Sequence, residues 1–325
     1  MDKVNMEKMN VNTINRNQAD AERELDMVII GSGPAGLTAA IYGVRAKLEL
    51  VVIEKEMMSG GQILNTSAVD NYPGFLGIGG FELGQKFREH ADELGVSFVT
   101  DSVKSLEVRE DGIKRVVCGE NSYLARTVVI ASGAHHSLLG APGEKELTGM
   151  GVSYCATCDG ALYRDRVTAV VGGGDVALGD ALVLARLCKK VYLIHRRDAF
   201  RGARSLQAKV LETENIIPVL DSVVTELRGE GQLKSLAVKN VKSGELQELE
   251  VDGLFVAVGI VPESGTFDCV EKDARGYIKA GEDCATSVPG IYAAGDVRLK
   301  PLRQVITAAA DGANAVESAV HYLNQ

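Results

Sequence analysis

Two segments of the chain share one pattern: a short apolar strand, a glycine-rich turn, a helix and a second apolar strand. The first spans residues 25–53 and contains GSGPAG at 31–36; the second spans residues 167–194 and contains GGGD at 172–175. This order is typical of a βαβ unit that binds a dinucleotide. The spacing from Gly31 to Glu54 equals that from Gly172 to His195, so the two units match in register. The pattern predicts an α/β protein with two Rossmann-like nucleotide-binding domains.

The chain length of 325 residues also favours two domains, because one hydrophobic core seldom serves so many residues. Three further apolar runs, at 128–134, 254–260 and 290–297, read as buried strands that end at a nucleotide site. We assign the third run to the first domain, which makes the second domain an insertion. The predicted parts are a polar N-terminal extension (1–24), a discontinuous first domain (25–135 and 265–325) and an inserted second domain (136–264).

Charge and hydropathy exclude several classes of protein. The formal net charge of −9 argues against binding a polyanion, so we expect no nucleic-acid partner. No stretch approaches the roughly 18 consecutive apolar residues of a membrane span, and the first 24 residues contain no apolar run of a signal peptide. We therefore expect a cytoplasmic protein with no membrane partner.

The first glycine turn has the residues that a pyrophosphate requires. Glycines permit the tight turn, the close approach of the phosphates and the close packing of helix on strand, and the helix N-terminus supplies amide donors. Glu54, at the end of the second strand, can accept hydrogen bonds from a ribose 2'-hydroxyl but would repel a 2'-phosphate. This site is predicted to bind FAD or NAD rather than NADP.

The second site has a basic cluster where the first has an acid. The cluster comprises His195-Arg196-Arg197, with Arg201 expected one helical turn further on. Guanidinium groups bind phosphate oxygens through paired hydrogen bonds, so the cluster predicts NADPH. A solvated basic helix start is the alternative. The residues predicted to bind NADPH are Gly173, Gly174, Asp175, Val176, His195, Arg196, Arg197 and Arg201.

Cys155 and Cys158 are the only two of the six cysteines that form a local pair. Sulfurs at this spacing can form a disulfide, and such a pair in a reducing cytoplasm favours redox catalysis or metal binding. A zinc ion would need about four ligands, and no second such pair follows, so no metal is expected; zinc and an inert buried pair remain the alternatives. Asp159 is a candidate general acid, or simply a helix cap.

A strand-end acid occurs again in Ala294-Gly295-Asp296. The segment Arg303-Gln304-Val305 follows and opens an alanine-rich helix predicted to run to Val316. An acid in this place can hold a polyol hydroxyl, and the helix N-terminus can direct backbone dipoles at a flavin carbonyl; a plain cap is the alternative.

Taken together, these motifs and their order resemble those of the low-molecular-weight thioredoxin reductases. The likeness covers nearly everything after Glu24, and CATCDG at 155–160 preceding GGGD is its most specific feature. It also includes GGQ at 60–62, NYPG at 71–74 and HRRDAFR at 195–201. The resemblance implies a homodimer with FAD in the first domain and NADPH in the second, which also carries the cysteine pair.

The same resemblance implies a mechanism. Hydride passes from NADPH to the flavin, the flavin opens the Cys155–Cys158 disulfide, and the dithiol reduces a thioredoxin-type protein disulfide. Cys158 faces the flavin, Cys155 attacks the substrate, and the domains rotate about hinges near Gly133–His136 and Ser264–Phe267. The predicted FAD contacts are Gly31, Gly33, Pro34, Ala35, Gly36, Glu54, Gly61, Gln62, Asn71, Gly133, Gly295, Asp296, Arg303, Gln304 and Val305.

The sequence departs from the family pattern at several positions. Val176 replaces a usual Ser or Thr, Gly179-Asp180 a usual Glu-containing pair, and Ser132 a usual Thr. The first two changes motivate an alternative in which the same flavin and dithiol take electrons from another donor, such as ferredoxin. A second alternative is a non-catalytic redox-sensing flavoprotein. A peroxide-linked disulfide reductase is disfavoured because its relatives carry a long extra N-terminal domain.

Overall fold

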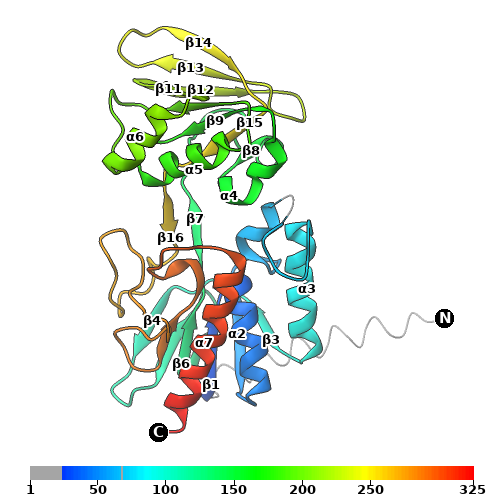
Figure 1. Ribbon diagram of the computed structural model, residues 1–325. Coiled ribbons are helices and arrows are strands. Elements are labelled where there is room, and N and C mark those ends of the chain that lie inside the picture. Colours follow the sequence, from blue (N-terminus) through cyan, green and yellow to red (C-terminus); the bar gives the residue numbers. More distant parts are fainter. Residues whose placement is uncertain (1–23, 67–68) are drawn as a thin grey trace, which may run out of the picture. The chain divides into compact units, whose positions relative to one another are not determined.

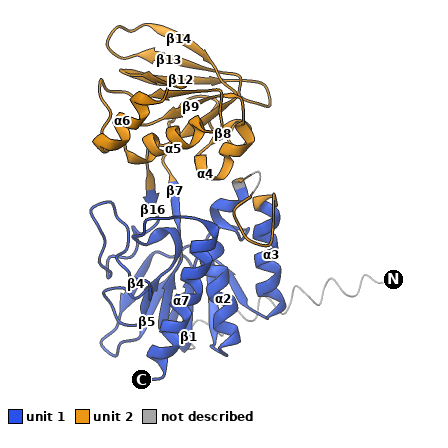
Figure 2. Cartoon of the chain, in the orientation of Figure 1, with its two compact units in different colours: residues 1–64, 81–135, 261–325 blue, residues 65–80, 136–260 orange. Residues whose placement is uncertain are grey.

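The computed structural model describes residues 24–66 and 69–325 (Figure 1). These residues form two compact units (Figure 2). Unit 1 comprises the residues up to Leu64, Phe81–His135 and Val261–Gln325, and unit 2 comprises Asn65–Gly80 and His136–Ile260. The N-terminal extension predicted for residues 1–24 lies outside the described residues, except for Glu24, which begins the first strand.

Unit 1 is built on a sheet in the order β3-β2-β1-β6-β5-β4, with β17 beside β6. The strands are β1 (Glu24–Ile30), β2 (Leu50–Glu54), β3 (Ser97–Thr100), β4 (Ser105–Val108), β5 (Lys114–Val117), β6 (Ser122–Ile130) and β17 (Ile291–Ala293). All pairs except β4–β5 and β5–β6 are parallel. The carboxyl ends of β1, β6 and β17 therefore meet at one edge, where parallel sheets bind ligands.

The two faces of this sheet have separate cores. Alternate residues of β1 point to opposite sides, so Met27 and Ile29 enter one core while Val28 and Ile30 enter the other. The first core also contains residues of α2 (Pro34–Arg45) and α7 (Val305–Leu323), which pack on each other. The helical segments of unit 1 are α2 (Pro34–Arg45), η1 (Gly61–Asn65, all but its last residue), α3 (Gly80–Glu93, all but its first), η3 (Gly295–Val297) and α7 (Val305–Leu323).

Unit 2 has a parallel sheet in the order β11-β10-β9-β15-β8 and an antiparallel sheet in the order β12-β13-β14. Val170 of β9 packs toward the helices, while its neighbours Ala169 and Val171 pack toward the antiparallel sheet. The strands are β8 (Val152–Ser153), β9 (Val167–Val171), β10 (Lys190–Ile194), β11 (Ile216–Val219), β12 (Ser222–Arg228), β13 (Ser235–Asn240), β14 (Leu246–Glu250) and β15 (Gly253–Val256). The helical segments are α4 (Ala156–Asp159), η2 (Gly160–Tyr163), α5 (Asp175–Ala185) and α6 (Arg204–Glu212).

The chain passes between the units through two short strands, β7 (Ala134–His136) and β16 (Ile260–Pro262), which pair with each other. The first predicted hinge, Gly133–His136, includes β7. The second predicted hinge, Ser264–Phe267, begins two residues after β16, and rotation about either hinge stays a prediction. Phe267 is 1% exposed and packs in a core of unit 1, so the crossing takes place a few residues earlier.

The predicted α/β class with two Rossmann-like units, the second inserted in the first, is confirmed. Strands β9 and β10 have the predicted bounds, and α2 ends at Arg45, one residue before the predicted end. The last helix is longer than predicted, because α7 continues beyond Val316 to Leu323. The units change at 135/136 and 260/261, and residues 65–80 group with unit 2. Which nucleotide each domain binds stays a prediction at this point.

Candidate active site

The paired cysteines lie at the start of a single helical turn in unit 2. Cys155 is the N-cap of α4, and it forms a disulfide with Cys158 across a Cα–Cα distance of 5.3 Å. The backbone N–H of Cys158 donates to Cys155 Sγ at 3.2 Å. Both residues are only partly buried. The pair is therefore a local disulfide at the start of a helical turn, and such a pair can cycle between disulfide and dithiol.

Asp159 ends the same turn and is half-buried. Its Oδ2 accepts a 2.6 Å hydrogen bond from the Ser153 hydroxyl, while its Oδ1 is buried and has no hydrogen-bond partner among the described residues. Burial raises the pKa of Asp159, the Ser153 hydrogen bond opposes that rise, and the charge of Asp70 adds to it. A carboxyl group with a raised pKa beside a disulfide can deliver a proton to a departing thiolate.

The glycine turn of unit 1 has little room on one side and open space on the other. Gly31 has a φ of +101°, and a side chain there would collide with the carbonyl of Ala131. A Cβ on Gly36 would collide with the carbonyl of Gly31, whereas a Cβ on Gly33 would meet no atom within 4 Å. Gly31 and Gly36 thus permit the packing of α2 on the sheet. Gly33 leaves the backbone accessible to a pyrophosphate.

Glu54 ends β2 and reaches back to this turn. Its Oε2 accepts hydrogen bonds of 2.7 Å from both the backbone N–H and the hydroxyl of Ser32. The backbone N–H of Glu56 donates to Oε1 at 3.0 Å. Because a carboxylate has about four acceptor positions, Glu54 can still accept a bond from a ribose hydroxyl. The Ser32 contacts fix the carboxylate beside the turn, and its predicted hydrogen bond to a ribose stays a prediction.

Two buried polar groups in unit 1 have unused hydrogen-bonding capacity. Asp296 Oδ1 and Arg303 Nε have no hydrogen-bond partner among the described residues, although the Arg303 guanidinium lies 4.0 Å from the centre of the Tyr277 ring. Burial raises the pKa of Asp296, while the charges of Lys300 and Arg303 oppose that rise. A bound ligand can satisfy such groups, and a polyol chain with an adjacent flavin has hydrogen-bonding groups that suit both.

Gln304 and Val305 lie where the last helix begins. Gln304 is the N-cap of α7 and shares a capping box with Thr307, and Val305 is the first helical residue. The helix thus begins where predicted, and its backbone dipole has its positive end there. Gly295, on the preceding turn, has a φ of +79° and packs against Ala35 of α2. Gly295 therefore lies beside the helix of the first glycine turn, and the roles of Gln304 and Val305 toward FAD stay predictions.

Of the remaining predicted FAD contacts, Gly61 lies against the first glycine turn: a Cβ on it would stand 3.3 Å from Gly33 Cα, and the N–H of its neighbour Gly60 donates to the carbonyl of Ser32 at 2.9 Å. Gly61 and Gln62 lie in η1 and are exposed, and Gly133 precedes β7 with a φ of +74°. Asn71 is exposed and lies in the segment 65–80, which groups with unit 2. Their roles toward FAD stay predictions.

The glycine turn of unit 2 is tied to the loop that carries the arginines. The backbone N–H groups of Arg201 and Gly202 both donate to the carbonyl of Gly173, at 2.7 and 3.1 Å. The N–H of Ala203 donates to Asp175 Oδ1 at 2.7 Å. A Cβ on Gly173 would collide with the His195 ring, whereas Gly174 is open. The expectation that Arg201 follows Arg197 by one helical turn is wrong, because residues 195–203 form a loop and α6 begins at Arg204.

This loop presents unneutralised positive charge. Arg196, Arg197 and Arg201 are exposed, and no ion pair within the described part of the chain involves them. His195 is buried, and its Nε2 has no hydrogen-bond partner among the described residues. Burial lowers the pKa of His195, and the charges of the three arginines lower it further. A neutral imidazole and free guanidinium groups beside a glycine turn can bind a nucleotide that carries an extra phosphate.

The departures at the start of α5 leave an apolar, open surface. Val176 is 62% exposed, and a Cβ on Gly179 would meet no atom within 4 Å. Asp180 is partly buried, and burial raises its pKa to about 6. The hydroxyl that the family pattern has at position 176 is thus missing from a side chain that faces solvent.

Sequence reasoning missed two groups of residues. Ser153, which binds Asp159, carries no motif. Arg298, Lys300 and Asp311 form a buried ion cluster in unit 1 that was not predicted. The only signal for it was an acidic residue inside an alanine-rich helix.

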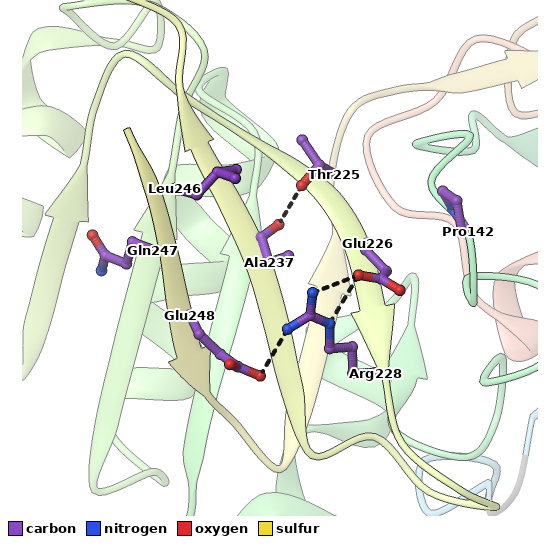
Figure 3. Close-up of a pocket in the computed structure, with 8 residues that line it drawn as sticks. All are labelled: Pro142, Thr225, Glu226, Arg228, Ala237, Leu246, Gln247 and Glu248. Atoms are coloured by element: carbon purple, nitrogen blue, oxygen red, sulfur yellow. Dashed lines mark hydrogen bonds and ion pairs between the residues drawn. The ribbon is translucent and has the colours of Figure 1, made fainter. Parts of the chain in front are cut away.

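One surface pocket of unit 2 contains none of the predicted site residues (Figure 3). It lies on the antiparallel sheet, where Arg228 is bonded to both Glu226 and Glu248. Because these acids already neutralise its only cation, the pocket suggests no ligand. Over the ranges 24–66 and 69–325, no group of three or more His, Cys, Asp or Glu side chains could hold a metal ion. Among the helices described, none is both long and apolar enough to cross a membrane.

Comparisons with known proteins agree on one family. The family model described as pyridine nucleotide-disulphide oxidoreductase matches residues 25–312. The thioredoxin reductase of Treponema pallidum (strain Nichols) is 41% identical, over 93% of this chain and 98% of that protein. The thioredoxin reductase of Peptoclostridium acidaminophilum is 43% identical, over 93% and 98%. The crystal structure of thioredoxin reductase from Streptococcus pyogenes MGAS5005 has a TM-score of 0.89 and 42% identity, covering 94% of this chain and 99% of that one.

Proposed function

The chain belongs to the pyridine nucleotide-disulphide oxidoreductase family, and on that premise we propose that it is an FAD-dependent thioredoxin reductase. Electrons pass from NADPH through FAD and the Cys155–Cys158 pair to the disulfide of a thioredoxin-type protein. The observation that carries this proposal is the Cys155–Cys158 disulfide followed directly by Asp159, in a chain that also has two nucleotide turns.

Each unit has the groups for its nucleotide. FAD belongs to unit 1, where Gly33 is open and Asp296 and Arg303 have unused buried polar atoms. NADPH belongs to unit 2, where the arginine loop is bonded to Gly173. When bound, FAD supplies a two-electron relay between the nicotinamide and the disulfide.

The cysteines and Asp159 perform the thiol chemistry. In the dithiol form, Cys155 attacks one sulfur of the substrate disulfide, and a mixed disulfide forms as the other substrate sulfur leaves. Asp159 supplies a proton to a departing thiolate. Cys158 then attacks Cys155, which restores the internal disulfide and releases the substrate as a dithiol. Two electrons have moved from the pair to the substrate, and NADPH replaces them.

The assembly and compartment follow from the same family. A homodimer in the cytoplasm is proposed on the resemblance to the thioredoxin reductases. Cys118, Cys188, Cys269 and Cys284 are free thiols, which suits a reducing compartment. Light scattering on the purified protein tests the dimer.

The decisive experiment follows NADPH consumption with thioredoxin as the acceptor. The wild-type protein should turn over, and Cys158→Ser should abolish turnover while NADPH still reduces the flavin. Cys269→Ser removes a free cysteine instead and should leave the rate unchanged. Absence of turnover with every thioredoxin tested would reject the thioredoxin assignment. A flavin that dithionite bleaches under anaerobic conditions but NADPH does not would identify a different donor, such as ferredoxin.

A further inference from the structure

Asp311 lies inside α7 and is 3% exposed. Its carboxylate accepts hydrogen bonds from three different residues. Arg298 donates from Nη2 to Oδ1 at 2.8 Å and from Nε to Oδ2 at 3.0 Å, and Lys300 Nζ donates to Oδ2 at 2.8 Å. The backbone N–H of Gly295 also donates to Oδ2, at 2.9 Å. One acid in the helix thus binds two cations and the turn that follows β17.

The two cations are buried with it. Side-chain exposures are 6% for Arg298 and 4% for Lys300. The spare donors of Arg298 reach the carbonyls of Ala280 and Gly281, and Lys300 also donates to the Thr307 hydroxyl. None of these further partners carries a charge. Asp311 thus pairs with both cations, while the carboxyl groups of Asp296 and Glu282 also act on Lys300 and Arg298 through their charges.

The cluster is in direct contact with the proposed flavin site. Gly295, which Asp311 binds, immediately precedes Asp296, and its φ of +79° sets the direction of the turn. The charge of Lys300 already acts on Asp296, since it opposes the rise of the pKa of that carboxyl. Gly312, next to Asp311 in α7, packs against the backbone of Ala35 and Ala39 in α2. The cluster is thus joined both to the turn that carries Asp296 and to the helix of the glycine motif.

A contribution to stability is a weak explanation for such a cluster. The loss of hydration on burying three ions offsets most of their attraction, and apolar side chains of similar volume often stabilise a fold as well or better. The individual charges of the cluster have a more specific consequence. Two-electron reduction of a flavin to its anionic form adds one negative charge, which a nearby buried cation favours.

We propose that Asp311 is a positioning residue for the flavin: it holds the Gly295–Asp296 turn and limits the buried positive charge of Arg298 and Lys300, which together set the reduction potential of the bound FAD. This inference rests on the proposed FAD site of unit 1. It does not depend on the identity of the protein substrate.

Adding or removing one charge in the cluster should change the equilibrium between oxidised and reduced flavin about tenfold. One unit charge about 10 Å away, in a medium of effective dielectric constant about 20, changes an equilibrium by roughly one order of magnitude. For a two-electron couple, a tenfold change corresponds to about 30 mV. This shift is large enough to measure by equilibration with a reference dye.

The test compares the reduction potential of the purified FAD-bound protein with those of two variants. Asp311→Asn removes the negative charge and should shift the equilibrium about tenfold toward reduced flavin. Lys300→Met removes a positive charge and should shift it about tenfold toward oxidised flavin. The control is Lys272→Met, which breaks the ion pair with the exposed Asp268 and should leave the potential unchanged. FAD dissociation, followed by flavin fluorescence, should be faster in Asp311→Asn because the turn is released.

The proposal requires that Asp311→Asn and Lys300→Met shift the reduction potential in opposite directions. A structural role alone would weaken FAD binding without moving the two potentials in opposite directions, so shifts of the same sign, or none, would overturn the proposal. If Asp311→Asn does not fold, Arg298→Met and Lys300→Met must each favour oxidised flavin, and unchanged potentials in both would equally overturn it. No thioredoxin is present in these measurements. Failure to reduce thioredoxin would therefore reject the proposed substrate and leave this result standing.

Discussion

The hydroxyl of Ser153 donates a 2.6 Å hydrogen bond to Oδ2 of Asp159. The same oxygen of Ser153 accepts a bond from the backbone N–H of Cys155 at 3.1 Å. One serine therefore connects the nucleophilic cysteine to the candidate acid. Its hydrogen bond favours the ionised carboxylate, and this lowers the pKa of Asp159 against the larger effect of burial, which raises it.

Ser153→Ala should extend activity to higher pH. A general acid works only while it is protonated, and loss of the hydroxyl raises the pKa of Asp159 further, so the alkaline limb of kcat should move upward. Asp159→Asn should instead lower kcat by about 10²–10⁴-fold. Rate profiles against pH check both variants. Thr213→Ala removes a hydroxyl of unit 2 that bonds the carbonyl of Lys209 instead, and it is the control. An alkaline limb that moves downward in Ser153→Ala would contradict the assignment.

Replacing Arg196 and Arg197 by Gln should reduce the preference for NADPH over NADH. A hydrogen bond to a charged group contributes about 1.5–3 kcal/mol, so each loss should raise KM for NADPH by about 10–100-fold. KM for NADH should stay within about twofold. Arg228→Gln is a matched control because Glu226 and Glu248 already neutralise Arg228. An equal loss with both nucleotides would show that the arginines do not read the extra phosphate.

Val176→Thr should strengthen NADPH binding. Val176 is exposed on the first turn of α5, where a hydroxyl can donate to a pyrophosphate oxygen. The gain should be about 0.5–1.5 kcal/mol, or up to roughly tenfold in Kd. Titration of the protein with NADP⁺ measures it. Val183→Thr, on the same helix, should have no effect, and a Kd that Val176→Thr leaves unchanged would place the pyrophosphate elsewhere.

Gly312→Ala should destabilise unit 1. The added methyl group would collide with the Ala35 carbonyl and the Ala39 amide where α7 packs on α2. Overpacking of this kind costs about 1–3 kcal/mol, so thermal unfolding should begin several degrees lower and release flavin with it. In the control variant Gly265→Ala the new Cβ meets no atom within 4 Å. Equal melting temperatures for the two variants would mean that α7 and α2 can move apart with little loss of folding free energy.

Local signals in the sequence were sufficient for most of the fold. Strand, glycine turn and helix follow each other within a few residues, and so Gly31, Gly36 and Glu54 could be assigned together from spacing alone. The second crossing between the units could not be located in this way, because no local signal in residues 260–267 shows which of them are buried in a core. Phe267 is an apolar residue whichever unit it belongs to. Only its burial in a core of unit 1 shows that the chain crosses before it, at Ile260–Pro262.

The site divides in the same way. The sequence by itself determined the chemical groups: a cysteine pair, an acid beside it, an acid after one nucleotide unit and arginines after the other. Tertiary structure alone decided which partners those groups have, such as Ser153 on Asp159, Gly173 bonded to Arg201, and Arg298 and Lys300 on Asp311. Motifs arise from neighbours along the chain, whereas the charge and hydrogen-bonding state of a buried group depends on residues that folding brings to it.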